Sequence, residues 1–107
     1  MLNLLNAPIL TSFGNFNYNP ISVEEAKQLV QHGFTSYIGH KITCEIISQI
    51  LSVEVPERRE QYKQQVGEQA LIFQLKIRLG PGQVLKTREE IEAVGYEFGL
   101  ITKIKNI

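Results

Sequence analysis

The pattern of apolar and polar residues changes period several times along the chain, and each change predicts a new element. Residues 2–10 are almost continuously apolar and are bounded by a segment containing Asn and Gly, which predicts a strand buried on both faces. Aromatic and Asn residues alternate from Phe13 to Tyr18, which predicts a turn and a short edge strand before Pro20. Near the end, Tyr96, Phe98, Leu100 and Ile104 alternate with Glu97, Lys103 and Lys105. This alternation predicts a last strand with one covered face.

Two segments begin with the signature of a helix N-terminus. Ser22 is followed three residues later by Glu25, a capping-box pair, and apolar residues then recur at helical spacing up to Gly33. Thr87 begins a second such box, and the short helix that it predicts ends at Gly95. Between these two helices, a longer apolar stripe predicts a third.

This middle helix carries apolar residues at helical spacing from Ile38 to Leu51, with Thr35 or Ser36 as the predicted N-cap. Its many β-branched residues lower its intrinsic propensity, so burial against a sheet must hold it. His40 then lies at the helix start, next to Gly39, whose missing side chain would let a ligand approach.

Two extended runs, residues 58–66 and 69–78, flank Gly67 and Glu68, a pattern typical of a β-hairpin. A period of two places three cations on the polar sides of these strands: Arg59, Lys63 and Arg78. If those sides coincide, the sheet has a cationic polar face.

The order of strand, helix, helix, hairpin, helix and strand predicts a single α/β domain over residues 1–107, with a mixed central β-sheet flanked by helices. A chain of 107 residues with 43% hydrophobic residues suits one core. Eleven basic and eleven acidic residues cancel, so we expect no broad attraction for duplex DNA or for an anionic membrane. Cys44 has no intrachain disulfide partner and no basic leader precedes the first apolar run, so a cytoplasmic protein is expected.

His40 is the strongest candidate for chemistry. Imidazole titrates near neutrality, and a helix N-terminus offers N–H groups to phosphate, so a bound phosphate would favour the protonated ring that hands a proton to a leaving oxygen. The plainer alternative is an ordinary, partly exposed residue at a helix start. Cys44 follows four residues later, but the sequence places no third ligand beside the pair, so neither a metal nor a cofactor is expected. The sequence also contains no phosphate loop of the GxxxxGK type and no nucleophile elbow.

Several short segments together resemble the viral type III anti-CRISPR ring nucleases, small proteins of archaeal viruses, phages and bacterial mobile elements. The resemblance covers nearly the whole chain in order. Its motifs are Leu5-Asn6-Ala7, Ile38-Gly39-His40, the pair Arg59 and Lys63 after Val55-Pro56, and Ile77-Arg78-Leu79 before a Gly-bearing loop.

The resemblance implies a metal-independent phosphodiesterase that cleaves cyclic tetra-adenylate, the messenger of type III CRISPR defence, to linear adenylates with 2′,3′-cyclic phosphate ends. It also implies a homodimer that binds one ring across its two-fold axis. His40 would be the general acid, Arg78 a catalytic cation and Arg59 a phosphate ligand. Asn6, Gly39 and Lys63 would complete the set of ligand-binding residues. If the carrier is a virus, the protein would act in the cytoplasm of the host cell.

The sequence departs from the family pattern at two positions. Ile9 stands where characterised relatives tend to have a serine, and Pro81 stands where they have a glutamate. Thr11 or Ser12 would have to supply the missing hydroxyl. These departures keep two alternatives open: a protein that binds and sequesters a cyclic oligonucleotide without cleaving it, and a structural or protein-interaction subunit in which His40 has no chemical role.

Overall fold

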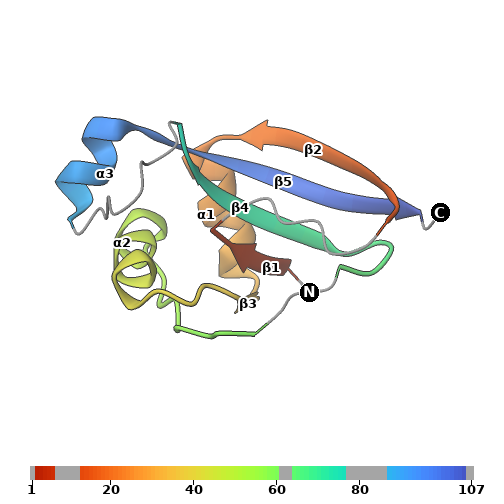
Figure 1. Cartoon of the computed structure of the whole chain (residues 1–107), viewed down its shortest axis with the longest axis horizontal. Coiled ribbons are helices and arrows are strands. Elements are labelled where there is room, and N and C mark those ends of the chain that lie inside the picture. Colours follow the sequence, from red (N-terminus) through yellow and green to blue (C-terminus); the bar gives the residue numbers. More distant parts are fainter. Residues whose placement is uncertain (1, 7–12, 61–63, 77–86, 106–107) are drawn as a thin grey trace.

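A five-stranded mixed sheet forms the centre of the protein, in the order β2-β5-β4-β1-β3 (Figure 1). The computed structural model describes residues 2–6, 13–60, 64–76 and 87–105. The α/β class and the mixed sheet predicted from the sequence are confirmed. In chain order the elements are β1 (Leu2–Leu5), β2 (Asn15–Ile21), α1 (Val23–Gln31), β3 (Phe34–Ser36), α2 (Lys41–Leu51), β4 (Gln69–Leu75), α3 (Arg88–Val94) and β5 (Tyr96–Lys105).

Three neighbouring strands run parallel, and this sets where their ends lie. In β1, Leu4 is paired with Ser36 of β3 on one side and with Leu71 of β4 on the other. Strand β5 is antiparallel to both β4 and β2. The carboxyl ends of β1, β3 and β4 therefore share one edge of the sheet, and β1 points toward the end of the molecule that carries α2 and α3 (Figure 1).

The main core lies between one face of the sheet and the three helices. Alternate strand residues such as Leu4, Leu71 and Phe98 point to this face, and they form one cluster with Ala26 of α1, Ile47 of α2 and other helix residues. Leu4 and Ile47 are completely buried. Burial of each such side chain contributes roughly 1.5–3 kcal/mol, which explains how α2 is held despite its many β-branched residues.

The opposite face of the sheet carries a smaller apolar cluster of Leu5, Ala70, Ile72 and Ile101. Lys103 of β5 lies on this face and is 4% exposed. It donates through Nζ to the carbonyl oxygen of Gln64 at 3.4 Å. The prediction that only one face of the last strand is covered was therefore wrong.

The predicted hairpin is half correct. Gln69–Leu75 is a strand, and Gly67 lies in a turn with a φ of 87°. Residues 57–60 and 64–65 are not in a strand, and β4 pairs with β1 and β5 instead. Arg59 lies outside the sheet and so contributes nothing to the predicted cationic sheet face, whereas Lys63 and Arg78 lie outside the described residues.

The helix predictions are confirmed except at one boundary. The Ser22 capping box is present, and Gly33 follows α1 with a φ of 101°. Thr87 caps α3, which ends at Gly95. Helix α2, however, has His40 itself as N-cap, because the residues predicted to cap it form β3. Within the described ranges, no helix has the length and apolar character needed to cross a membrane.

Candidate functional site

The site predicted around His40 lies at the shared carboxyl edge of the parallel strands. Asn6 directly follows β1, and residues 37–40 connect β3 to α2. The backbone N–H of Tyr37 donates to the carbonyl oxygen of Leu4 at 2.9 Å, so the segment after β3 stays beside β1. This edge is where open α/β sheets commonly bind ligands. The topology thus brings Asn6, Gly39 and His40 to one edge of the sheet.

His40 occupies a position from which its side chain can reach a ligand. It is exposed, it has an extended backbone, and it makes no side-chain capping bond to α2. Its carbonyl oxygen accepts the N–H of Cys44 at 3.0 Å, which begins the helix. Since the imidazole does not cap the first turn, that turn leaves backbone N–H groups for an anion beside the ring.

The segment after Val55 brings Arg59 next to His40. The N–H of Arg58 donates to the carbonyl oxygen of Ile38, and Nε of Arg59 donates to that of Gly39, both at 2.9 Å. The Arg59 side chain is 77% exposed, and Nε lies 3.9 Å from a carboxylate oxygen of Glu57. The guanidinium is therefore anchored at one nitrogen while its outer nitrogens reach solvent beside His40.

Replacing Gly39 with alanine should disturb this contact. A Cβ at position 39 would lie 2.8 Å from Cγ of Arg59, so the arginine would have to move away from the Gly39 carbonyl. If Arg59 binds phosphate, we expect G39A to weaken binding of cyclic tetra-adenylate by about two- to tenfold, the effect of one lost hydrogen bond. Calorimetric titration of G39A, R59A and the double variant checks this. If G39A acts through Arg59, the double variant should bind no more weakly than R59A alone. A double variant whose loss of binding free energy equals the sum of the two single losses would contradict this.

Arg58 is a contact residue that the sequence did not reveal. Its guanidinium carbon lies 5.1 Å from the centre of the Tyr37 ring, and Nη2 donates to a carboxylate oxygen of Glu60 at 2.7 Å. That hydrogen bond raises the pKa of Arg58 above its usual value, so the group stays charged. Nothing in the sequence shows that Tyr37 and Arg58 lie together.

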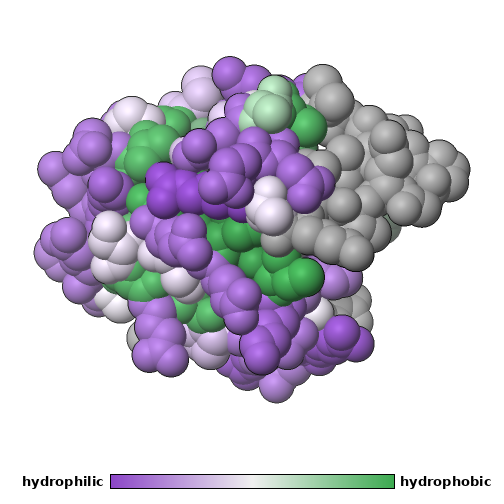
Figure 2. All heavy atoms as spheres, turned by 90° about the vertical axis from the view of Figure 1, so that its left-hand side faces the viewer, coloured by the Kyte–Doolittle hydropathy of each residue, from purple (hydrophilic) through white to green (hydrophobic). Residues whose placement is uncertain are grey.

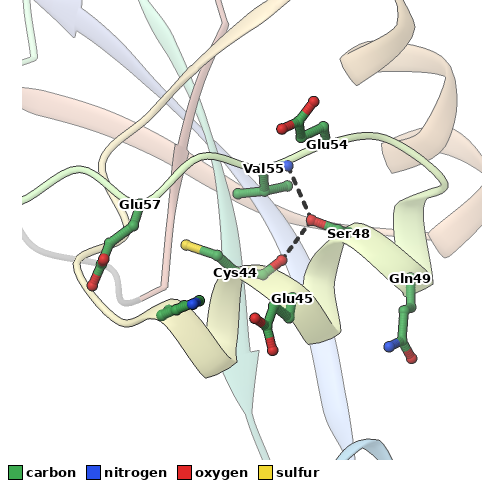
Figure 3. A pocket seen from close by; sticks show the side chains of 8 residues that line it. Cys44, Glu45, Ser48, Gln49, Glu54, Val55 and Glu57 are labelled. Carbon is green, nitrogen blue, oxygen red and sulfur yellow. Dashed lines mark hydrogen bonds between the residues drawn. The ribbon is translucent and has the colours of Figure 1, made fainter.

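A cavity of about 620 Å³ lies on the outer side of α2, between the helix and the segment that follows it (Figure 3). The Ser48 hydroxyl ties the two together, donating to the carbonyl oxygen of Cys44 at 2.6 Å and accepting the N–H of Val55 at 2.9 Å. The charged residues of the lining are Lys41, Glu45, Glu54 and Glu57. Three carboxylates against one ammonium make this cavity unsuited to a phosphate.

The thiol of Cys44 faces the same cavity but is 3% exposed. Burial raises the pKa of the thiol, and the nearby carboxylates of Glu57 and Glu45 raise it further. The thiol donates to the carbonyl oxygen of Ile38, 3.5 Å from Sγ. A thiol held in its neutral form is a poor nucleophile. Cys44 is therefore a packing residue with no part in the chemistry of the site.

We expect Cys44 to react with a disulfide reagent at neutral pH at least about tenfold more slowly in the folded protein than in urea-unfolded protein, because only the thiolate attacks and the folded chain disfavours it. Following release of the aromatic thiol by absorbance measures both rates. Equal rates in the two states would show that the side chain is accessible and ionised.

Several predicted site residues lie outside the described part of the chain: Thr11, Ser12, Lys63 and Arg78, together with Ile9 and Pro81. Their proposed roles stay predictions. In the ranges that the structure does describe, no group of at least three metal-ligating side chains comes together.

Seen from the end that carries α2 and α3, the described surface is mainly hydrophilic, with apolar residues showing between the polar ones (Figure 2).

The chain has relatives over almost its whole length. The uncharacterized protein ORF117 of Acidianus two-tailed virus is 38% identical over 108 residues, which cover 98% of this chain and 92% of that protein. Protein 26 of a Sulfolobus islandicus filamentous virus is 36% identical over 105 residues, 94% and 89% of the two chains. The Bacillus subtilis protein YddF is 30% identical over 103 residues, 94% of each chain.

A solved structure shares the fold. B116 of Sulfolobus turreted icosahedral virus superposes with a TM-score of 0.71 over 94% of this chain and 97% of its own, at 20% identity. Relatives in archaeal viruses agree with the viral family that the sequence resembled. A family model described as STIV B116-like matches residues 2–98, and the chain belongs to this STIV B116-like family.

Proposed function

We propose that this protein is a ring nuclease that cleaves cyclic tetra-adenylate without a metal and so suppresses type III CRISPR signalling. The observation that carries the proposal is the position of His40: exposed, at the start of α2, and beside an arginine held on the neighbouring Gly39 carbonyl. A proton donor next to a cation and unpaired helix N–H groups is the arrangement that cleavage of a phosphodiester by its own ribose requires.

In the proposed reaction, a ribose 2′-hydroxyl attacks the adjacent phosphorus and the bond from phosphorus to the 5′ oxygen breaks. The proton of the 2′-hydroxyl passes to solvent, and protonated His40 donates its own proton to the departing 5′ oxygen. Arg59, with Arg78 as a second cation, stabilises the charge that develops on the phosphoryl oxygens. The product end is a 2′,3′-cyclic phosphate, so the protein supplies orientation, a proton and positive charge but no nucleophile.

We further propose a homodimer, because a ring of identical nucleotides has the two-fold symmetry that two copies of the chain would share. Each subunit would then present one His40 to an equivalent phosphate. Analytical ultracentrifugation with and without the ring tests this directly. A monomer at every concentration, with one ring bound per chain, would contradict it.

The second candidate is a protein that sequesters the ring without cleaving it, since Ile9 and Pro81 replace a serine and a glutamate of the family pattern. Incubating pure protein with labelled cyclic tetra-adenylate in EDTA separates the two. Linear product with a 2′,3′-cyclic phosphate end supports the nuclease, whereas a tight complex from which intact ring is recovered after long incubation supports sequestration. A protein that binds no ring contradicts both.

A further inference from the structure

We infer that Arg58 is a base-stacking residue, which presents the flat face of its guanidinium to one adenine of the bound ring. This inference rests on the proposed function, because it assigns the residue that recognises the base at the site where His40 and Arg59 would hold the phosphate. The consecutive arginines would thus divide the work, Arg59 contacting phosphate and Arg58 contacting a base.

Carbonyl oxygens of the segment that leads into α2 hold both arginines. Ile38 accepts the backbone N–H of Arg58 and Gly39 accepts the side-chain Nε of Arg59, each at 2.9 Å. Their side chains diverge from there: Arg59 turns to the Gly39 carbonyl beside His40, and Arg58 turns to the Tyr37 ring. The base and the phosphate of a nucleotide are joined through one ribose and lie close together. Two neighbouring residues whose side chains diverge can therefore contact both, one the phosphate and the other the base.

The guanidinium of Arg58 is held on two sides. Tyr37 lies beneath it at 5.1 Å and itself packs against the apolar cluster of Leu5, Ala70 and Ile72. Glu60 accepts from its edge at 2.7 Å, and the side chain is still 42% exposed. A guanidinium held by a ring and by a carboxylate, and still 42% exposed, offers surface to a ligand, and less rotational freedom is lost when a ligand covers it.

Unpaired bases are commonly recognised by stacking on aromatic rings and on arginine planes. Adenine, a purine, offers a larger face than a pyrimidine does. A lysine at this position would keep the positive charge but offers no flat surface. Replacing Arg58 with lysine therefore removes stacking but keeps the charge, and replacing adenine with uracil reduces the stacking surface of the ligand.

The test compares R58K with R88K by calorimetric titration with cyclic tetra-adenylate and cyclic tetra-uridylate in EDTA. Arg88 of α3 is the matched control, because its side chain is also 42% exposed and also pairs with a carboxylate, that of Glu92 at 2.9 Å. We expect R58K to bind the adenylate ring about tenfold or more weakly than wild type and to lose clearly less for the uridylate ring. R88K should bind both rings as wild type does.

Wild-type affinity of R58K for the adenylate ring would overturn the assignment while leaving the proposed function intact. An equal loss for both rings would also overturn it, since that is the result expected of a purely structural ion pair. If wild-type protein binds neither ring, the proposed function fails instead. Thermal melting of both variants shows that they are folded, and R58A, which loses charge as well, should bind no more tightly than R58K.

Discussion

Replacing His40 with alanine is expected to slow cleavage of cyclic tetra-adenylate by about 10²- to 10⁴-fold, the usual contribution of a positioned general acid. The side chain makes no capping bond and is exposed, so its loss should leave the fold intact. Binding of the ring should change little, because Arg59 and the first turn of α2 remain. Single-turnover rates measured with excess enzyme separate the chemical step from binding.

The matched control for this substitution is H32A. His32 is the other histidine of the chain, also exposed, and it lies at the C-terminal end of α1. We expect H32A to cleave at the wild-type rate. Cleavage by H40A at that rate as well would remove His40 from the reaction and leave its position at the helix start as an ordinary structural feature.

The largest expected effect on stability follows from replacing Phe98 with alanine. Phe98 is 2% exposed and packs against Phe73, with ring centres 5.6 Å apart, and against Tyr96 at 6.0 Å. Removing a buried aromatic ring costs about 3–5 kcal/mol, because both the transfer energy and the packing around the cavity are lost. Urea unfolding of F98A, followed by circular dichroism, should show a loss of this size.

Ile104 is the matched control on the same strand, because it is 56% exposed. We expect I104A to change the free energy of unfolding by less than about 0.5 kcal/mol, as is usual at the surface. A loss at Ile104 as large as that at Phe98 would mean that the Ile104 side chain is buried, which contradicts its 56% exposure.

The local signals in the sequence predicted most of the elements correctly. The Ser22 capping box, the Gly33 stop and the Thr87 N-cap act within a single helical turn, so the sequence contains all that determines them. Strand β3 was missed for the opposite reason. It has only three residues, and what makes it a strand is its parallel pairing with β1, a tertiary contact.

The hairpin prediction failed because a two-residue Gly turn indicates that the chain reverses but not what the preceding residues pair with. Before the turn, Arg58 and Arg59 bond to Ile38 and Gly39 instead of to β4, whose two edges are already occupied by β1 and β5. Two strand edges filled by other elements leave no room for a hairpin partner.

The candidate site shows the same division. The position of Gly39 and His40 at a helix start could be predicted, because it depends on the apolar pattern of the helix that follows them. The contact of Arg58 with Tyr37 could not, since these residues are distant in sequence and meet only when the segment after Val55 returns to α2. Lys103 was predicted to face solvent for a similar reason. Its ammonium donates to the carbonyl oxygen of Gln64, a residue far away in the sequence whose side chain donates to Ile101 of β5.

A single-turnover assay of the wild-type protein with labelled cyclic tetra-adenylate in EDTA, with the product ends identified by mass, tests directly whether the protein is a metal-independent ring nuclease. We expect linear adenylates that end in a 2′,3′-cyclic phosphate, formed at the same rate with and without the chelator. Intact ring after long incubation with excess protein, or product that forms only when divalent metal is restored, would contradict it.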